Sequence, residues 1–225
     1  MEFNSNETGV SYSHAMARVK RKYESAVRTE SAQRTREAIA KAARRLFAAR
    51  GFAGTPIESI AQEAGVSVQT VYAVFRTKRA VLLSMLDAVD DQADVGALRA
   101  QLAGGSVAAQ RKAVARFMTR LFTRGGDIIV ATRAAGAADP ELRALLKKGL
   151  ERHRRGSRAI IASWSKAGAL RRGLSAADAA DALDAITSFA IYAELRSAGW
   201  SARKYEQWLN DAIERLVLTT SASSE

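Results

Sequence analysis

Residues 55–75 contain two short amphipathic segments separated by one glycine, and this spacing restricts the fold more than any other feature of the chain. Thr55 is a suitable helix N-cap, and Glu58 stands at the spacing that completes a capping box with it. Gly65 supplies the left-handed backbone that ends a helix, and Ser67 suits the N-cap of the next one. The pattern predicts two helices joined by a tight turn, which is the helix-turn-helix arrangement.

The second of these helices presents a mainly polar ridge once its apolar residues are assigned to the core. Val71, Val74 and Phe75 recur at helical steps and are expected to be buried. On the opposite face, Gln69 can donate and accept at an adenine edge, and Ala73 can contact a thymine methyl group. The candidate DNA-contacting residues are Thr55, Ser67, Val68, Gln69, Thr70, Tyr72, Ala73 and Lys78.

Four of these candidates, Thr55, Ser67, Tyr72 and Lys78, carry groups that suit phosphate oxygens. Phosphate contacts set the register of a protein on the duplex, whereas base contacts specify its sequence. The alternative interpretation of the whole stretch is a small three-helix core that binds no nucleic acid. Agreement among the caps, the turn glycine and the basic surroundings favours DNA binding.

The stretch around these helices resembles the tetracycline-repressor (TetR) family over about residues 34–83. The matching positions are Ala43, Leu46, Phe47, Gly51, Phe52, Thr55, Ile60, Ala61, Ala64, Gly65, Val66, Ser67, Val71, Tyr72, Phe75, Lys78, Leu82 and Leu83. Val74 stands where the family often has histidine or another polar residue, and Arg79 stands where an acidic residue is usual. The resemblance implies an all-α regulator with an N-terminal three-helix DNA-binding domain and a C-terminal helical domain for ligand binding and dimerisation.

Composition agrees with an all-α protein. The 225 residues can bury a sizeable core, helix-forming residues are frequent, and proline occurs only twice. The absence of cysteine excludes disulfides and thiolate metal sites. The N-terminus lacks the regions of a signal peptide, and no stretch approaches the ~20 apolar residues of a membrane span. We therefore expect a cytoplasmic protein without membrane association.

The net charge of +12 is concentrated toward the N-terminus. Residues 1–78 carry 13 basic and 7 acidic residues, and residues 79–225 carry 22 and 16, so each part has a charge of +6. The shorter part is about twice as basic per residue, which favours an anionic partner. Charge alone does not separate DNA from a membrane surface, but the motif indicates DNA.

The chain divides into three expected regions. Residues 1–31 are predicted to be a disordered basic tail, which is either an arm for DNA or a solvated segment. Residues 32–78 form the predicted helix-turn-helix domain. Residues 79–225 form the predicted effector-binding and dimerisation domain.

Hydrophobic periodicity predicts the remaining helices. One at about residues 32–50 precedes the motif and ends at Gly51, and another at about 78–92 follows it. Residues 93–105 are interpreted as a linker or an irregular helix edge because they contain three glycines. The body helices are expected at about 106–124, 127–137, 139–168, 175–198 and 201–219.

The last two predicted helices are candidates for a subunit interface. The helix at 175–198 is apolar on more than one face, which is typical of burial on several sides. The resemblance implies that this pair forms half of an intersubunit four-helix bundle, and two headpieces read a palindrome better than one. An ordinary intrachain core is the alternative. The candidate interface residues are Leu183, Ile186, Ile191, Leu195, Trp208, Leu209, Ile213 and Leu216.

Aromatic and polar residues of the body are candidates for an effector pocket, although such residues more often fill a core. The candidates are Phe117, Met118, Phe122, His153, Trp164, Phe189 and Tyr192. His153 falls on the apolar side of its helix, where it either contacts a small molecule or is satisfied within the core. Residues 143–158 carry seven Lys and Arg against Glu151 alone. This charge indicates either an acidic effector, such as an acyl-CoA or carboxylate, or a solvated face.

No signature of catalysis accompanies these features. The two histidines, His14 and His153, lie in different regions, and no paired-carboxylate, metal-binding or phosphate-loop motif occurs. We expect no enzyme activity, cofactor or metal. The prediction is a homodimeric, ligand-responsive regulator, most consistent with a repressor, that binds a palindromic operator of double-stranded DNA and is released by an unknown small-molecule effector. The alternative is a ligand-independent architectural or nonspecific DNA-binding protein.

Overall fold

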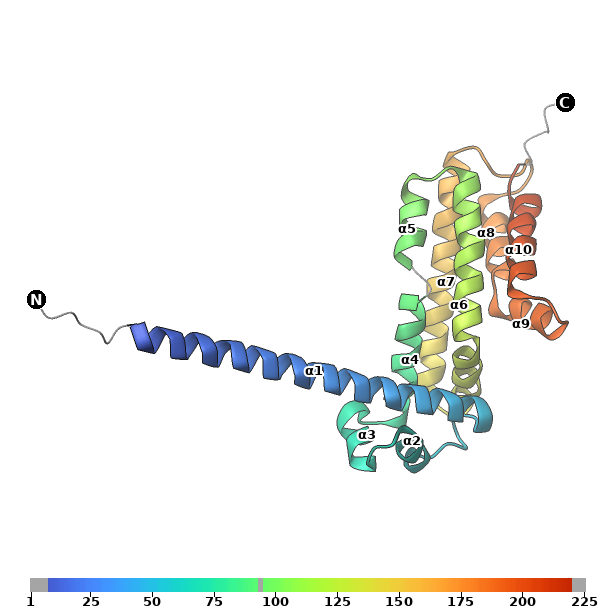
Figure 1. Cartoon of the computed structure of the whole chain (residues 1–225). Coiled ribbons are helices and arrows are strands. Elements are labelled where there is room, and N and C mark those ends of the chain that lie inside the picture. The colour runs from blue at the N-terminus through green and yellow to red at the C-terminus, as the bar shows by residue number, and fades with distance from the viewer. Residues whose placement is uncertain (1–7, 93–94, 220–225) are drawn as a thin grey trace, which may run out of the picture.

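The computed structural model describes residues 8–92 and 95–219, and the side chains of 29–86 and 95–219. These residues form α1 (Thr8–Arg50), α2 (Ile57–Ala64), α3 (Val68–Phe75), α4 (Lys78–Gln92), α5 (Val95–Gly104), α6 (Val107–Gly136), α7 (Pro140–Lys166), α8 (Ala176–Ile186), α9 (Phe189–Ser197) and α10 (Ala202–Val217). The predicted all-α class is confirmed. Figure 1 shows α2 and α3 beneath α1, with α4 to α10 in an upright bundle above them. None of the described helices combines the length and apolarity needed to cross a bilayer.

The first three helices form the head of the molecule around one apolar core. Ile39 of α1, Ile60 of α2 and Val71 of α3 are at most 1% exposed. Gly51 and Gly65 adopt φ values of +69° and +67°, which are the left-handed conformations expected where α1 and α2 end. The local signals around the turn therefore correspond to the observed geometry.

α1 begins at Thr8, far ahead of the start predicted near residue 32, and extends beyond the head (Figure 1). Residues 10–31 contain neither glycine nor proline, so nothing in them interrupts a helix that is nucleated by packed residues further along. The structure thus has helix at residues 8–31, where a disordered tail was predicted. Residues 1–7 lie outside the described part of the chain.

The start of α2 differs from the predicted capping box. Pro56 holds the N-cap position without a side-chain cap bond, and Thr55 is fully buried. Thr55 Oγ1 donates to the carbonyl of Gly51 at 2.8 Å and lies 3.3 Å from that of Leu46. A buried hydroxyl needs a partner, and here the end of α1 provides it. The capping box between Thr55 and Glu58 was therefore a wrong prediction.

Two body segments are more helical than expected. α5 occupies most of the stretch interpreted as linker, and residues 93–94 lie outside the described part. α6 is one helix where two were predicted, because it continues through Gly125 and Gly126. A Cβ added at Gly126 would lie 3.1 Å from the ring of Phe189 in α9. Close packing against α9, rather than a turn, accounts for this glycine.

The helix predicted at 175–198 is instead two helices. α8 ends at Ile186, and α9 starts after Ser188, whose hydroxyl accepts from the Ile191 amide at 3.4 Å. Thr187 Oγ1 donates to the Leu183 carbonyl at 2.6 Å. Adjacent hydroxyl side chains compete for backbone groups, and this competition favours a break. Apolar periodicity does not detect such a break because both halves keep buried residues.

Two apolar clusters support this arrangement. The first combines the head with Val81 and Leu82 of α4 and with Ile128 and Leu142 from the adjoining ends of α6 and α7. The second lies in the body and includes Trp164, whose side chain is fully buried. Packing in the first cluster thus continues across residue 78. The domain division proposed at that residue remains a prediction.

Candidate nucleic-acid interface

α3 carries the surface on which DNA recognition was predicted. Ser67 Oγ accepts from the Thr70 amide at 3.1 Å, so the predicted N-cap is confirmed. The two hydroxyls of Ser67 and Thr70 also lie 2.9 Å apart. Gln69, Tyr72 and Ala73 are exposed, with Tyr72 at 48%. An exposed ridge of one amide, one phenol and one methyl group can meet both base edges and phosphates.

Three predicted contact residues make contacts within the protein. Thr55 is buried, and Val68 packs against the head core rather than pointing away from it. Lys78 Nζ donates to the carbonyls of Phe52 at 2.8 Å and Thr55 at 2.9 Å, and it lies 4.5 Å from the Phe52 ring centroid. Burial lowers the pKa of Lys78. This lysine therefore fastens the α1–α2 turn to the start of α4.

Two arginines near α3 have roles that the sequence patterns did not assign. Arg36 donates to the Val74 carbonyl at 3.2 Å, and its guanidinium lies 4.6 Å from the Phe75 ring centroid. Arg76 has a φ of +60° and is the one non-glycine residue with positive φ in the described part of the chain. Such a conformation is strained and persists only where neighbouring contacts stabilise it. Contacts around the end of α3 therefore hold Arg76 in this conformation. Nothing in the local sequence indicated this backbone.

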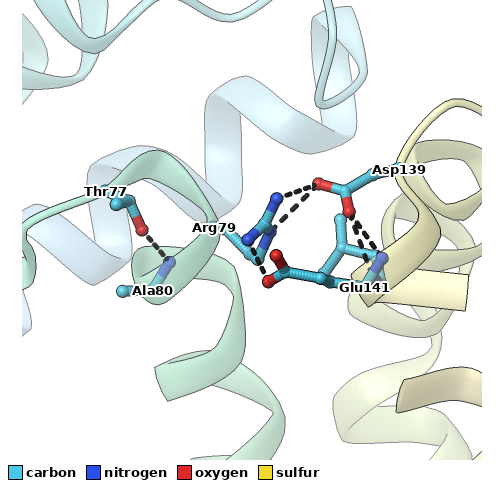
Figure 2. A network of polar contacts seen from close by, with 6 residues as sticks. Thr77, Arg79, Ala80, Asp139 and Glu141 are labelled. Carbon is cyan, nitrogen blue, oxygen red and sulfur yellow. Dashed lines mark hydrogen bonds and ion pairs between the residues drawn. The ribbon is translucent and has the colours of Figure 1, made fainter. Parts of the chain in front are cut away.

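Arg79, at the start of α4 and directly after the head, contacts the start of α7 (Figure 2). Its Nε and Nη2 donate to Asp139 Oδ2 at 3.0 and 2.9 Å, and its Nη1 donates to Glu141. Asp139 Oδ1 accepts from the amides of Glu141 at 2.9 Å and Leu142 at 3.2 Å. One oxygen of Asp139 therefore caps α7 while the other holds α4. The sequence marked Arg79 only as a departure from the family pattern.

A second polar contact joins the head to α6. Arg44 of α1 donates from Nε and Nη2 to the Asp127 carboxylate at 2.7 and 2.8 Å, and from Nη2 to the Arg124 carbonyl. Asp127 directly follows the glycine pair that leaves α6 unbroken. Polar contacts thus join the head to α6 and join α4, the helix that follows the head, to the start of α7.

The environment of Asp139 lowers the pKa of its carboxyl group. Burial alone would raise the pKa of this carboxyl, but hydrogen bonds from the Leu142 amide, the Arg79 guanidinium and the Glu141 amide outweigh burial and lower it below 3.8. The hydrogen bond to Asp139 is also the main reason that the pKa of Arg79 is raised. The charged forms of both residues are therefore favoured in the folded protein.

We expect Asp139→Asn to remove part of the acid sensitivity of folding. Because the folded-state pKa lies below the unfolded value of 3.8, the carboxylate contributes its full stabilisation above that value. This contribution is lost as the pH falls through the lower, folded-state pKa. The urea midpoint should therefore fall less in the variant than in the wild type between about pH 6 and about pH 2.5.

The matched control for this experiment is Glu151→Gln, which neutralises an exposed carboxylate of the same helix. It should leave the acid dependence of the midpoint unchanged. Asp139→Asn should also be less stable than the wild type at neutral pH, because the amide accepts more weakly from Arg79. Superimposable pH curves for Asp139→Asn and wild type would contradict the assignment.

The predicted effector residues contribute to the body core. The ring centroids of Phe122, Phe189 and Tyr192 lie 5.3–6.1 Å apart, so these side chains fill the space between α6 and α9. Trp164 Nε1 donates to Gln110 Oε1 at 2.7 Å in a buried contact. Phe117 and Met118 belong to the same cluster. An effector role for this set remains a prediction and requires the cluster to open.

His153 has partners within the protein. Its Nε2 lies 3.1 Å from Thr187 Oγ1 and 3.2 Å from Asp184 Oδ1. Arg154 Nε is 3.6 Å from the other oxygen of Asp184. The histidine therefore connects α7 to the break between α8 and α9, which agrees with the alternative of a satisfied core residue.

The predicted dimer residues fall into three groups by exposure. Leu183, Leu209 and Ile213 are at most 1% exposed within this chain, so their side chains pack within their own subunit. Ile191 and Leu216 are 37% and 44% exposed. The other three, Ile186, Leu195 and Trp208, are half-buried. The apolar stripe of α10 that contains Leu209 and Ile213 therefore belongs to the core of its own subunit.

Comparison with known protein sequences identifies relatives of the head. Residues 39–85 match the sequence profile of the family described as bacterial regulatory proteins, tetR family. The chain is 49% identical over 49 residues to the uncharacterized HTH-type transcriptional regulator YerO of Bacillus subtilis strain 168. That match spans 22% of this chain and 17% of YerO, so it concerns only part of either protein.

Solved structures share the fold over most of the chain. A regulator-like protein of Saccharomonospora viridis, solved in complex with choline, is 22% identical with a TM-score of 0.68, and the match covers 82% of this chain and 98% of that one. NalD of Pseudomonas aeruginosa, the secondary repressor of the MexAB-OprM multidrug efflux pump, is 22% identical with a TM-score of 0.65, over 83% and 98% of the two chains. At this level of identity the likeness concerns the fold.

Proposed function

We propose that this chain is a DNA-binding transcriptional regulator of the TetR family. In this proposal it is a homodimeric repressor that a small molecule releases from a palindromic operator. The observation that carries the proposal is the exposed ridge of Gln69, Tyr72 and Ala73 on α3. NalD is named as a repressor, and the Saccharomonospora protein was solved with choline. These relatives support repression and ligand binding as proposals for this chain.

Each residue of the ridge has a distinct proposed contact. Gln69 reads a base edge through its amide, which pairs best with adenine, while Ala73 contacts a thymine methyl group. Tyr72, Ser67 and Thr70 bind phosphates and set the register. Lys78 positions the start of α4, since its ammonium already donates to two carbonyls of the head.

The subunit interface is proposed on the outer surface of α8, α9 and α10. Ile191 of α9 and Leu216 of α10 are exposed apolar residues in this region, and Trp208 of α10 is half-buried. A two-fold axis through this surface would present two α3 helices to successive major grooves, roughly 34–36 Å apart. The proposed site of action is the cytoplasm, where bacterial DNA is located.

Release by an effector requires that the body and the head move together. Arg44–Asp127 joins the head to α6, and Arg79–Asp139 joins the start of α4 to α7. A ligand that favours another position of α6 or α7 would alter the separation of the two α3 helices. Its effect on operator affinity is limited by its differential affinity for the two arrangements.

The proposal is tested by selecting duplexes from a random library with the purified protein. We expect a palindromic consensus with half-sites about 10 bp apart or at a multiple of that distance, and one or two dimers per duplex by light scattering. Affinity should fall steeply as salt increases. Binding without sequence preference would instead support the architectural alternative, and a protein that selects no duplex would reject the proposal.

A further inference from the structure

A cavity of about 350 Å³ lies between α7 and α8, apart from the predicted aromatic set, and it is open to solvent, with both of its charged side chains exposed. Its apolar lining includes Ile161 and Ala162 of α7 and Ala177 and Ala180 of α8. Its charged lining consists of Arg158 on the α7 side and Asp181 on the α8 side. The volume falls within the range of small-molecule sites, which is about 300–1,000 Å³.

The two charged residues of this cavity have no hydrogen-bond or ion-pair partner among the described residues. Charges about one turn away on the same helices are engaged. Arg154 lies 3.6 Å from Asp184, and Asp178 accepts from Ser175 Oγ at 2.6 Å. Opposite charges therefore face one cavity without pairing across it, which leaves both available to a ligand.

We propose that this cavity binds a zwitterion with an apolar body of about the size of phenylalanine. The ligand carboxylate binds the Arg158 guanidinium, the ligand ammonium donates to the Asp181 carboxylate, and the apolar body packs on Ile161. A ligand with both charges satisfies both sides of the cavity. A ligand with a single charge forms only one of these two charge-assisted contacts, so it binds more weakly.

α7 connects this cavity to the head. Arg158 and Ile161 lie on the same continuous helix whose N-cap, Asp139, holds Arg79 of α4. A ligand that draws α8 toward α7 therefore acts on a helix whose other end positions the DNA-binding head. This coupling rests on the proposed function, whereas ligand binding itself does not.

The test is calorimetric titration of the full chain with three probes that share one apolar body. L-phenylalanine carries both charges, hydrocinnamate lacks the ammonium, and phenethylamine lacks the carboxylate. We expect L-phenylalanine to bind about tenfold or more tightly than either analogue. Arg158→Gln should reduce L-phenylalanine to the affinity of phenethylamine, and Asp181→Asn should reduce it to that of hydrocinnamate.

Two further variants make the result specific. Lys148→Gln removes an exposed charge of α7 that does not line the cavity, and it should preserve the tenfold preference. Ala177→Trp fills the cavity and should abolish binding of all three probes. Equal affinities for the three probes, or an unchanged preference in Arg158→Gln, would overturn the proposal. Conversion of the protein to a monomer by Ala177→Arg would also overturn it, because the cavity would then be a subunit interface.

Duplex binding is measured separately on the same preparation. A protein that selects a palindrome but shows no preference for L-phenylalanine would refute the zwitterion site and leave the regulator proposal intact. A protein that binds L-phenylalanine with the expected preference but selects no duplex would retain the site and refute the regulator proposal.

Discussion

Trp164→Ala is expected to lower the free energy of unfolding by about 3–5 kcal/mol, the largest loss for any single substitution proposed for this protein. Trp164 is the largest fully buried side chain of the described residues, and its removal leaves a cavity between α7 and the second cluster. The substitution also leaves Gln110 Oε1 without its donor, which lies at 2.7 Å. An unpaired buried acceptor adds its own desolvation cost.

The effect should extend to α5. Gln110 Nε2 donates to the carbonyls of Leu102 at 3.2 Å and Gly105 at 2.9 Å, so this amide connects Trp164 to the turn between α5 and α6. Hydrogen exchange at the end of α5 should accelerate in Trp164→Ala. The free energy of unfolding is measured by urea titration monitored by circular dichroism.

Two variants separate the volume from the hydrogen bond. Trp164→Phe keeps most of the apolar contact but cannot donate, and it should lose about 1–3 kcal/mol. Replacing Gln110 by Leu in that background should cost little more, because the two groups act as a pair. The half-buried Trp208 is the matched control, and Trp208→Ala should lose less than Trp164→Ala. Equal losses of unfolding free energy in Trp164→Ala and Trp208→Ala would contradict the prediction that the buried Trp164 stabilises the fold more than Trp208 does.

Gln69→Ala is expected to weaken binding to the selected duplex by about 1–3 kcal/mol and to relax the preference at one base pair of each half-site. Gln69 is exposed on α3, and no hydrogen bond within the described residues occupies its amide. Affinity for unrelated duplexes should hardly change, since nonspecific binding depends on phosphate contacts.

The measurement is competition binding across a library in which each base pair of the selected duplex is varied. Gln62→Ala provides the matched control, because Gln62 is an exposed glutamine of α2 that lies outside the α3 ridge. Its binding profile should match that of the wild type. If both variants give the same profile, Gln69 does not read a base and the proposed orientation of α3 is wrong.

The head could be predicted well because its signals are local. Gly65 ends one helix and Ser67 caps the next through contacts within a few residues of chain, and both act as expected. The apolar steps of α3 also identify which face remains exposed. Local signals did not predict that Thr55 and Lys78 donate to carbonyls at the end of α1 and in the following turn. Which carbonyls lie within reach depends on how α1, α2 and α4 pack.

The body could be predicted only in outline. Gly125 and Gly126 resemble a turn in the sequence, yet α6 continues because α9 packs against Gly126. Arg79 and Asp139 are 60 residues apart, so their contact leaves no periodic signal. The roles of the dimer and effector residues were difficult to predict for a related reason. An apolar stripe in the sequence does not reveal whether it faces its own subunit, a ligand or a partner.

The sequence by itself determined the helical class, the helix-turn-helix and the exposed ridge of Gln69, Tyr72 and Ala73, because caps, turn glycines and apolar steps act over one or two turns of helix. Only the tertiary structure decided that Lys78 is held by the head, that Arg79 connects the start of α4 to α7, and that a charged cavity opens between α7 and α8. These features depend on groups far apart in the chain, whose proximity is set by packing rather than by local preference.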